Sequence, residues 1–124
     1  IESMIDSVRD NREDEVERLL SEGLDVNSQN SDGETALHMA MGYNRVNIVR
    51  RLLARPETRL NIKHRSGLTS LYWACRSYRI EAIRVFCQNA RCTPDLVRRC
   101  LHNTSSFEIK ATVLSNLEVY LPDI

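Results

Sequence analysis

The chain has 124 residues, 42% of them hydrophobic and 27% charged, which are the proportions of one ordinary globular domain. No apolar run approaches the roughly 20 residues that a membrane-spanning helix needs, and no secretory signal is recognisable, so neither a span nor secretion is expected. The net charge of zero hides an uneven distribution of charge along the chain. Residues 1–35 have a net charge of −8, residues 36–110 of +10 and the remaining residues of −2.

The first segment, residues 1–30, is predicted to hold two helices. Residues 1–10 form the first of them. Val16, Leu19 and Leu20 have the spacing of one apolar helix face and mark the second.

The next segment, residues 31–64, opens with SDGETALHMA. Leu37 and Ala40 lie three residues apart, which predicts one face of a short helix. Thr35 lies where its hydroxyl would cap the free amides of that helix. A second helix follows, with the apolar residues Val46, Ile48, Val49, Leu52 and Leu53.

Nearly the same phrase returns thirty-four positions later, as RSGLTSLYWA, and opens the segment 65–92. Thr69, Leu71 and Ala74 take the corresponding places. Such short helix pairs cannot bury their own apolar faces, so each must stack on a neighbour and the phrase is scaffold rather than a catalytic motif. The second helix of this segment carries Ile80, Ala82, Ile83, Phe86 and Cys87.

The last segment, residues 93–124, lacks the phrase. Thr93 and Pro94 suit the N-cap and first position of a helix that runs towards His102. Residues 105–108 fit a capping box for a final helix, which is expected to end at Pro122. We interpret this segment as a degenerate helix pair that caps the stack.

These units resemble ankyrin repeats, whose phrase Thr-Pro-Leu-His-x-Ala-Ala follows a β-turn finger within a unit of about 33 residues. Residues 35–40 match it closely and residues 69–74 less well, while residues 23–27 resemble the family's Gly-Ala-Asp-Val-Asn. The resemblance implies an all-α solenoid of stacked antiparallel helix pairs with two β-turn fingers. The single domain 1–124 would then divide into an N-terminal capping repeat (1–30), repeat 2 (31–64), repeat 3 without a finger at its end (65–92) and C-terminal capping helices (93–124).

The turn inside each helix pair needs a left-handed residue, usually glycine. The sequence offers Asn11, Asn44 and Tyr78 there. Asparagine tolerates that conformation, but tyrosine does not readily adopt it. We therefore expect either a rebuilt turn at Tyr78 or a register shifted by one residue.

No catalytic site is expected. In the family, the histidine at the position of His38 ties its helix to the neighbouring finger, and no nucleophile or carboxylate is placed to use this side chain as a base. His64 and His102 are interpreted as structural or exposed. The chain is therefore predicted not to be an enzyme and to need no cofactor.

Cys87, Cys92, Cys100 and His102 lie within sixteen residues and could be considered for zinc. The spacing lacks the tight Cys-x2-4-Cys pair of zinc knuckles, and Cys87 takes a core position, so no metal is expected. Without a secretory signal, we expect reduced thiols in the cytoplasm or nucleus.

The resemblance implies a concave partner-binding surface, formed by variable residues of the fingers and first helices. Tyr72 and Trp73 either fill the core or act as aromatic anchors on that surface. Leu68 is apolar at a finger tip without a packing reason. The first finger is acidic and the second basic, which would orient a peptide with opposite charges at its ends. The predicted partner-binding residues are Asp32, Glu34, Tyr43, Arg65, Ser66, Leu68, Tyr72, Trp73, Arg76 and Ser77.

A run of arginines suggests an alternative surface for phosphate or nucleic acid. No aromatic residues interleave with these arginines for base stacking, and a solvated outer helix face accounts for most of them, so nucleic acid is not expected. The run consists of Arg45, Arg50, Arg51, Arg55, Arg59 and Arg65.

We therefore predict a module that binds a partner protein or peptide through its concave finger and helix-one surface. Because the chain opens on Ile1 rather than Met, we expect it to belong to a larger intracellular protein. The module would be a monomer or a weak oligomer. Two alternatives stay open: a capped structural spacer or oligomerisation domain, and an arginine-rich surface for anionic partners.

Overall fold

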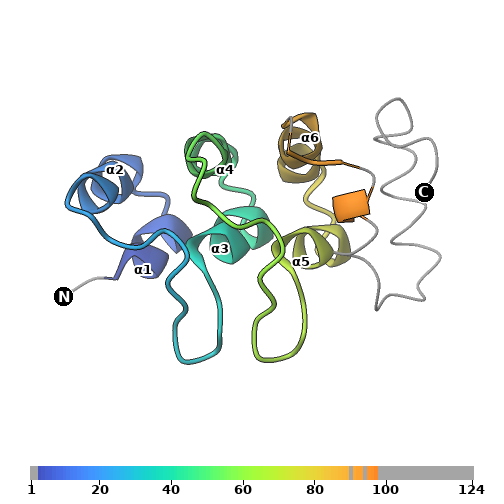
Figure 1. Cartoon of the computed structure of the whole chain (residues 1–124), viewed down its shortest axis with the longest axis horizontal. Coiled ribbons are helices and arrows are strands. Elements are labelled where there is room, and N and C mark those ends of the chain that lie inside the picture. The colour runs from blue at the N-terminus through green and yellow to red at the C-terminus, as the bar shows by residue number, and fades with distance from the viewer. Residues whose placement is uncertain (1–2, 90, 94, 98–124) are drawn as a thin grey trace.

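The computed structural model describes residues 3–89, 91–93 and 95–97, and within them three helix pairs stand side by side (Figure 1). This arrangement confirms the predicted all-α stack. Most of the predicted C-terminal cap lies outside the described residues. The helices are α1 (Met4–Arg9), α2 (Glu13–Ser21), α3 (Ala36–Gly42), α4 (Val46–Leu53), α5 (Ser70–Arg76) and α6 (Ile80–Gln88).

The helices form two layers. The first helices of the pairs, α1, α3 and α5, make one layer, and α2, α4 and α6 make the other (Figure 1). In the first layer, α3 packs against both α1 and α5. In the second layer, α4 packs against α6. Two long loops, between α2 and α3 and between α4 and α5, project from the first layer as the predicted fingers (Figure 1).

Hydroxyl caps fix where these helices begin. The Thr35 Oγ1 atom accepts the His38 N–H at 3.3 Å, and the Thr69 Oγ1 atom accepts the Tyr72 N–H at 3.2 Å, as predicted. The Thr93 Oγ1 atom likewise accepts the Leu96 N–H at 3.1 Å. Ser3 caps α1 in the same way, so α1 begins at Met4 and not at the predicted residue 1.

The core runs along the whole stack between the two layers. Leu71 of α5 and Ile48, Val49 and Leu52 of α4 have no exposed surface. The apolar residues predicted for the second helix of repeat 3 lie in α6, where Ile80, its first residue, is 39% exposed and does not belong to the core.

The turn between the two helices has the same left-handed conformation in all three pairs. Asn11, Asn44 and Tyr78 have φ values of 60°, 57° and 56°. The N–H of the next residue closes each turn on a carbonyl five residues earlier, at 2.8 Å for Arg12 and 2.9 Å for Arg79. The expectation of a rebuilt turn or shifted register at Tyr78 is therefore wrong, because these hydrogen bonds and the stacked helices impose the conformation.

Replacing Tyr78 with glycine is expected to raise the free energy of unfolding by about 1 kcal/mol, because a side chain in this conformation is strained. Tyr78 is 60% exposed, so little packing is lost. Thermal melting checks this, with Ser77→Gly as the control, since Ser77 has a φ of −94° and carries no such strain. A Tyr78→Gly melting temperature at or below that of the wild type contradicts the strain.

Arginines that follow the left-handed turn residue join one repeat to the previous one. The Arg45 Nε and Nη2 atoms donate to the Arg9 carbonyl oxygen at 3.0 and 2.6 Å. The Arg79 Nε atom donates in the same way to the Gly42 carbonyl oxygen at 2.8 Å. Each guanidinium therefore caps the C-terminal end of the preceding first-layer helix, where cations are favoured.

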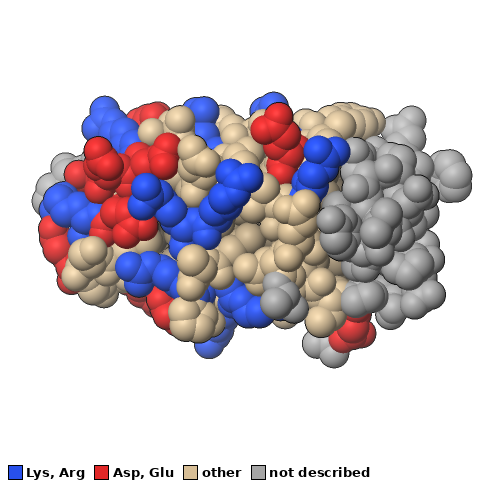
Figure 2. Space-filling view, turned by 90° about the horizontal axis from the view of Figure 1, so that it is seen from above, with Lys and Arg blue, Asp and Glu red and all other residues tan. Residues whose placement is uncertain are grey.

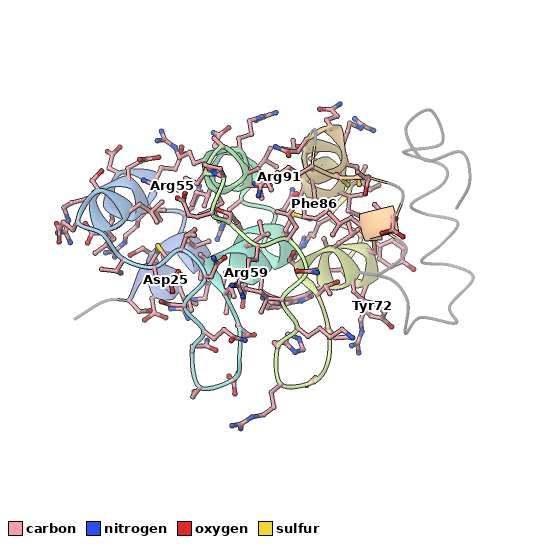
Figure 3. All side chains as sticks on the ribbon, in the orientation of Figure 1. Asp25, Arg55, Arg59, Tyr72, Phe86 and Arg91 are labelled. Atoms are coloured by element: carbon pink, nitrogen blue, oxygen red, sulfur yellow. The ribbon has the colours of Figure 1, made fainter. Side chains whose placement is uncertain are left out.

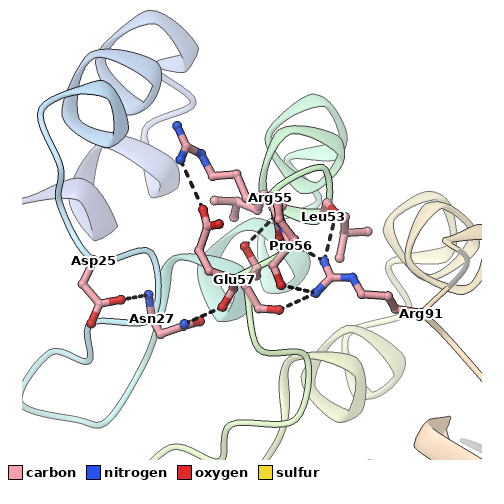
Figure 4. Close-up of polar contacts among 9 residues, drawn as sticks. Asp25, Asn27, Leu53, Arg55, Pro56, Glu57 and Arg91 are labelled. Carbon is pink, nitrogen blue, oxygen red and sulfur yellow. Dashed lines mark hydrogen bonds and ion pairs between the residues drawn. The ribbon is translucent and has the colours of Figure 1, made fainter.

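A second set of links holds the loop after α4, residues 54–58 (Figure 4). The Arg91 Nη1 atom donates to the Thr58 carbonyl oxygen at 2.6 Å, and its Nη2 atom donates to that of Leu53 at 2.9 Å. From the other side, the Asn27 Nδ2 atom donates to the Glu57 carbonyl oxygen at 2.8 Å. The loop is thus fixed by residues from both neighbouring repeats.

Candidate functional site

The two fingers are built on the same tight turn. In the first finger, residues 30–34, the Gly33 N–H donates to the Asn30 carbonyl oxygen at 2.9 Å. In the second finger, residues 64–68, the Gly67 N–H donates to the His64 carbonyl oxygen at 2.9 Å. Gly33 and Gly67 both have positive φ, 78° and 82°, which this turn requires.

The fingers are held against each other. The Arg65 N–H donates to the Asp32 carbonyl oxygen at 2.9 Å. A Cβ atom on Gly33 would lie only 2.9 Å from the Arg65 nitrogen, so glycine also permits this close approach. The second finger is therefore a supported element and not a free loop.

His38 fastens the second finger to α3. Its side chain is 1% exposed, and its Nε2 atom lies 3.0 Å from the Leu68 carbonyl oxygen. The Nδ1 atom accepts the Thr35 N–H at 3.1 Å, so the neutral ring carries its proton on Nε2 and donates it to Leu68. Burial lowers the pKa of His38, which favours this neutral form. The structural role implied for His38 is confirmed.

Trp73 connects α5 to α3 and to the base of the second finger. A Cβ atom on Gly42 would lie 2.8 Å from the indole ring, so the ring lies directly against the α3 backbone. The centroid of the indole is 6.1 Å from that of His64 and 6.3 Å from that of Tyr43, in edge-to-face arrangements. Trp73 is half-buried, so it packs on the core and still presents a surface.

A hollow of about 360 Å³ opens between the second finger and α5. Its lining combines the apolar surfaces of Trp73 and Leu68 with the guanidinium of Arg76 and with smaller polar groups. Arg76 is exposed and makes no ion pair or hydrogen bond within the described part of the chain. The residues that line the hollow are His64, Ser66, Leu68, Trp73, Arg76 and Ser77.

Five of the ten predicted binding residues line this hollow, and the others lie around or apart from it. Tyr43 adjoins it through Trp73, whereas Arg65, between the lining residues His64 and Ser66, contacts the Asp32 carbonyl oxygen through its N–H. The Glu34 carboxylate accepts the Asn30 Nδ2 hydrogen at 2.9 Å and is half-buried. Tyr72 lies on the side of α5 that faces away from α3, apart from the hollow (Figure 3).

Sequence reasoning missed one lining residue and one class of link. His64 was assigned a structural or exposed role, but it lines the hollow while its Nδ1 atom accepts the Ser66 N–H at 3.0 Å. Most of the arginine run is interpreted from the sequence as a solvated helix face, but Arg45 joins two repeats. The sequence contains a pattern that indicates this link, because Arg12, Arg45 and Arg79 each directly follow the residue of the left-handed turn.

The outer face of the stack carries charge of both signs. Acidic side chains gather at its N-terminal end and basic ones along its middle (Figure 2). Arg51 joins the two groups, with its guanidinium 3.4 Å from the Glu13 carboxylate and 2.9 Å from that of Glu17. Arg55 pairs with Glu57 at 3.3 Å. Part of the predicted arginine surface is thus used within the molecule.

The described residues also bear on metal binding and on membrane insertion. Within residues 3–89, 91–93 and 95–97, no three His, Cys, Asp or Glu side chains converge where they could hold a metal ion. Over the same residues, no helix has both the length and the apolar character needed to cross a bilayer.

A family model described as ankyrin repeats in three copies matches residues 4–98. Human Rabankyrin-5 is 37% identical to this chain over 57 residues, which are 46% of this chain and 5% of that protein. Mouse Rabankyrin-5 is 35% identical over the same length and share of each chain. The Drosophila melanogaster neurogenic locus Notch protein is 37% identical over 65 residues, 52% of this chain and 2% of Notch. The chain therefore corresponds to a small part of each relative.

Proposed function

The chain belongs to the ankyrin-repeat family, whose repeats generally mediate protein–protein interaction, and we propose that it binds a partner protein through the concave surface at the second finger and α5. The hollow beside Trp73 is the observation that carries this proposal. It combines a half-buried indole with a guanidinium that has no partner among the described residues, and aromatic and arginine side chains are the commonest hot spots of protein interfaces.

The second finger and Trp73 are held rigidly in place, which also supports this surface as the binding site. The second finger is fixed to α3 through His38 and to the first finger through Arg65. Trp73 is fixed against Gly42. A surface that is ordered before binding loses little conformational entropy when a partner arrives, so a small contact area can still give useful affinity.

The proposal places this domain within a larger intracellular protein. Rabankyrin-5 and Notch are much longer chains, of which the matched segments are 5% and 2%. Cys75, Cys87 and Cys92 are buried in or beside the core, as small hydrophobic side chains would be. We propose no enzymatic activity and no cofactor for this domain.

A pull-down from nuclease-treated cell lysate tests the proposed function. The wild-type domain is compared with a triple variant, Tyr43→Ala, Leu68→Glu and Arg76→Glu, that melts like the wild type. We expect at least one protein to be retained by the wild type and lost by the variant, because all three changes lie on or beside the hollow.

The control is a charge reversal on the outer face, Arg50→Glu and Arg84→Glu, which lie on α4 and α6 and are exposed. We expect this variant to retain the same proteins as the wild type. If the control variant loses those proteins and the triple variant retains them, the binding site lies on the outer arginines and the proposal is overturned. Nuclease treatment removes partners bridged by nucleic acid.

A further inference from the structure

We propose that the hollow beside Trp73 recognises a partner segment in which an acidic residue stands beside a large apolar residue. This inference rests on the proposed function and adds the chemistry of the partner. It is carried by three features of the hollow: its apolar side, its positive charge that has no counter-charge among the described residues, and its hydrogen-bond donors.

The apolar side of the hollow is formed by Trp73 and Leu68. Both are half-buried, so each has surface that the fold itself does not cover. Leu68 is placed there because its own backbone carbonyl oxygen is held by His38 at 3.0 Å. An indole and a leucine side chain that share one hollow favour an apolar side chain of the partner over a polar one.

The second finger and α5, which form the hollow, carry charge of one sign. Between residues 58 and 80 the sequence contains five bases and no acid. The Arg79 guanidinium is used in the link to Gly42, but Arg65, Arg76 and Lys63 are exposed, and their side chains have no ion pair among the described residues. A carboxylate on the partner would supply a counter-charge that the described residues do not, and a base would be repelled.

The remaining polar groups of the lining can donate hydrogen bonds. The His64 Nδ1 atom accepts the Ser66 N–H at 3.0 Å, which places the proton of the neutral ring on Nε2 as a donor. The hydroxyls of Ser66 and Ser77 are further donors. Donors together with a guanidinium suit a carboxylate, which only accepts hydrogen bonds.

The size of the hollow means that it can hold only a short segment of the partner. About 360 Å³ lies at the lower end of the range of roughly 300–1,000 Å³ for ligand pockets.

The acidic first finger contributes less than its sequence suggests, because the Glu34 carboxylate already accepts a hydrogen bond from Asn30. We therefore assign the specificity to the second finger and α5.

A displayed library of short random peptides, selected on the full chain, tests this inference. We expect the retained peptides to place Asp or Glu within a few positions of a large apolar residue. Charge reversal by Arg76→Glu should weaken these peptides by about tenfold. Replacing the peptide's acidic residue with lysine should restore binding to the Arg76→Glu variant, which a merely misfolded variant could not show.

The matched control is Arg84→Glu, the same charge change on an exposed arginine of α6 away from the hollow. It should change peptide affinity less than twofold. Peptides that depend on Trp73 and Leu68 but carry no acidic residue would overturn the inference and leave the proposed function in place. If no retained peptide depends on the residues of the hollow, both the inference and the proposed function fail.

Discussion

Leu71→Ala is expected to lower the free energy of unfolding by about 2–5 kcal/mol, the usual cost of a buried leucine truncated to alanine. Leu71 has no exposed surface and lies in α5, which packs against both α3 and α6. The cavity would therefore open between repeats as well as between layers. Leu37, the equivalent residue of α3, is 3% exposed and should show a loss in the same range.

Urea unfolding followed by circular dichroism measures both losses. The control is Leu24→Ala, because Leu24 is 44% exposed and its truncation leaves no cavity. We expect the control to unfold close to the wild type. Leucine-to-alanine variants at 37 and 71 that both unfold like the wild type would contradict the stacked core.

His38→Leu is expected to cost about 1–3 kcal/mol, because the buried Thr35 N–H loses its partner and the Leu68 carbonyl oxygen keeps only the His64 N–H. The Thr35 N–H loses the acceptor Nδ1 at 3.1 Å, and the Leu68 carbonyl oxygen loses the donor Nε2 at 3.0 Å. The second contact joins α3 to the second finger. The variant should therefore also increase hydrogen exchange of the amides at residues 64–68, while α1 keeps its protection.

The same histidine gives the protein a stability that depends on pH. Burial lowers the pKa of His38 below its ordinary value of 6.5, so the unfolded chain takes up a proton more readily than the folded one. The stability that neutral His38 contributes is fully present above pH 6.5. It is lost as the pH decreases from 6.5 towards the lowered pKa. Protonated Nδ1 could no longer accept the Thr35 N–H.

Unfolding measured from pH 7.5 to 5 checks this dependence in the wild type and in His38→Leu. The difference in stability between them should shrink as the pH falls, since only the wild type carries the lowered pKa. A difference that stays constant over this range contradicts a neutral, buried His38.

Much of the fold could be predicted because it is encoded locally and then repeated. Thr35 and Thr69 cap helices in the places that their sequence phrase indicates. A hydroxyl cap depends only on residues within one helical turn, and two copies at the same spacing strengthen each other. The role of His38 came from the family resemblance, since its partner Leu68 is thirty residues away.

The remaining features depend on tertiary structure. Tyr78 adopts a left-handed conformation that its own preference opposes, because the packed helices on both sides determine the path of the chain. Tyr72 and Trp73 are adjacent in sequence, but successive residues of a helix point in different directions, so only Trp73 lines the hollow. The sequence alone does not show which way α5 is turned, nor that the Trp73 indole packs against Gly42.

The most direct test of the proposed binding surface is an NMR titration of the isotope-labelled domain with the protein retained in the pull-down. Amide signals report the contact region without any substitution. We predict that the largest shifts fall on residues 64–77, which form the second finger, the hollow and α5. Shifts confined to α4 and α6, with residues 64–77 unchanged, would contradict the account and place binding on the outer face.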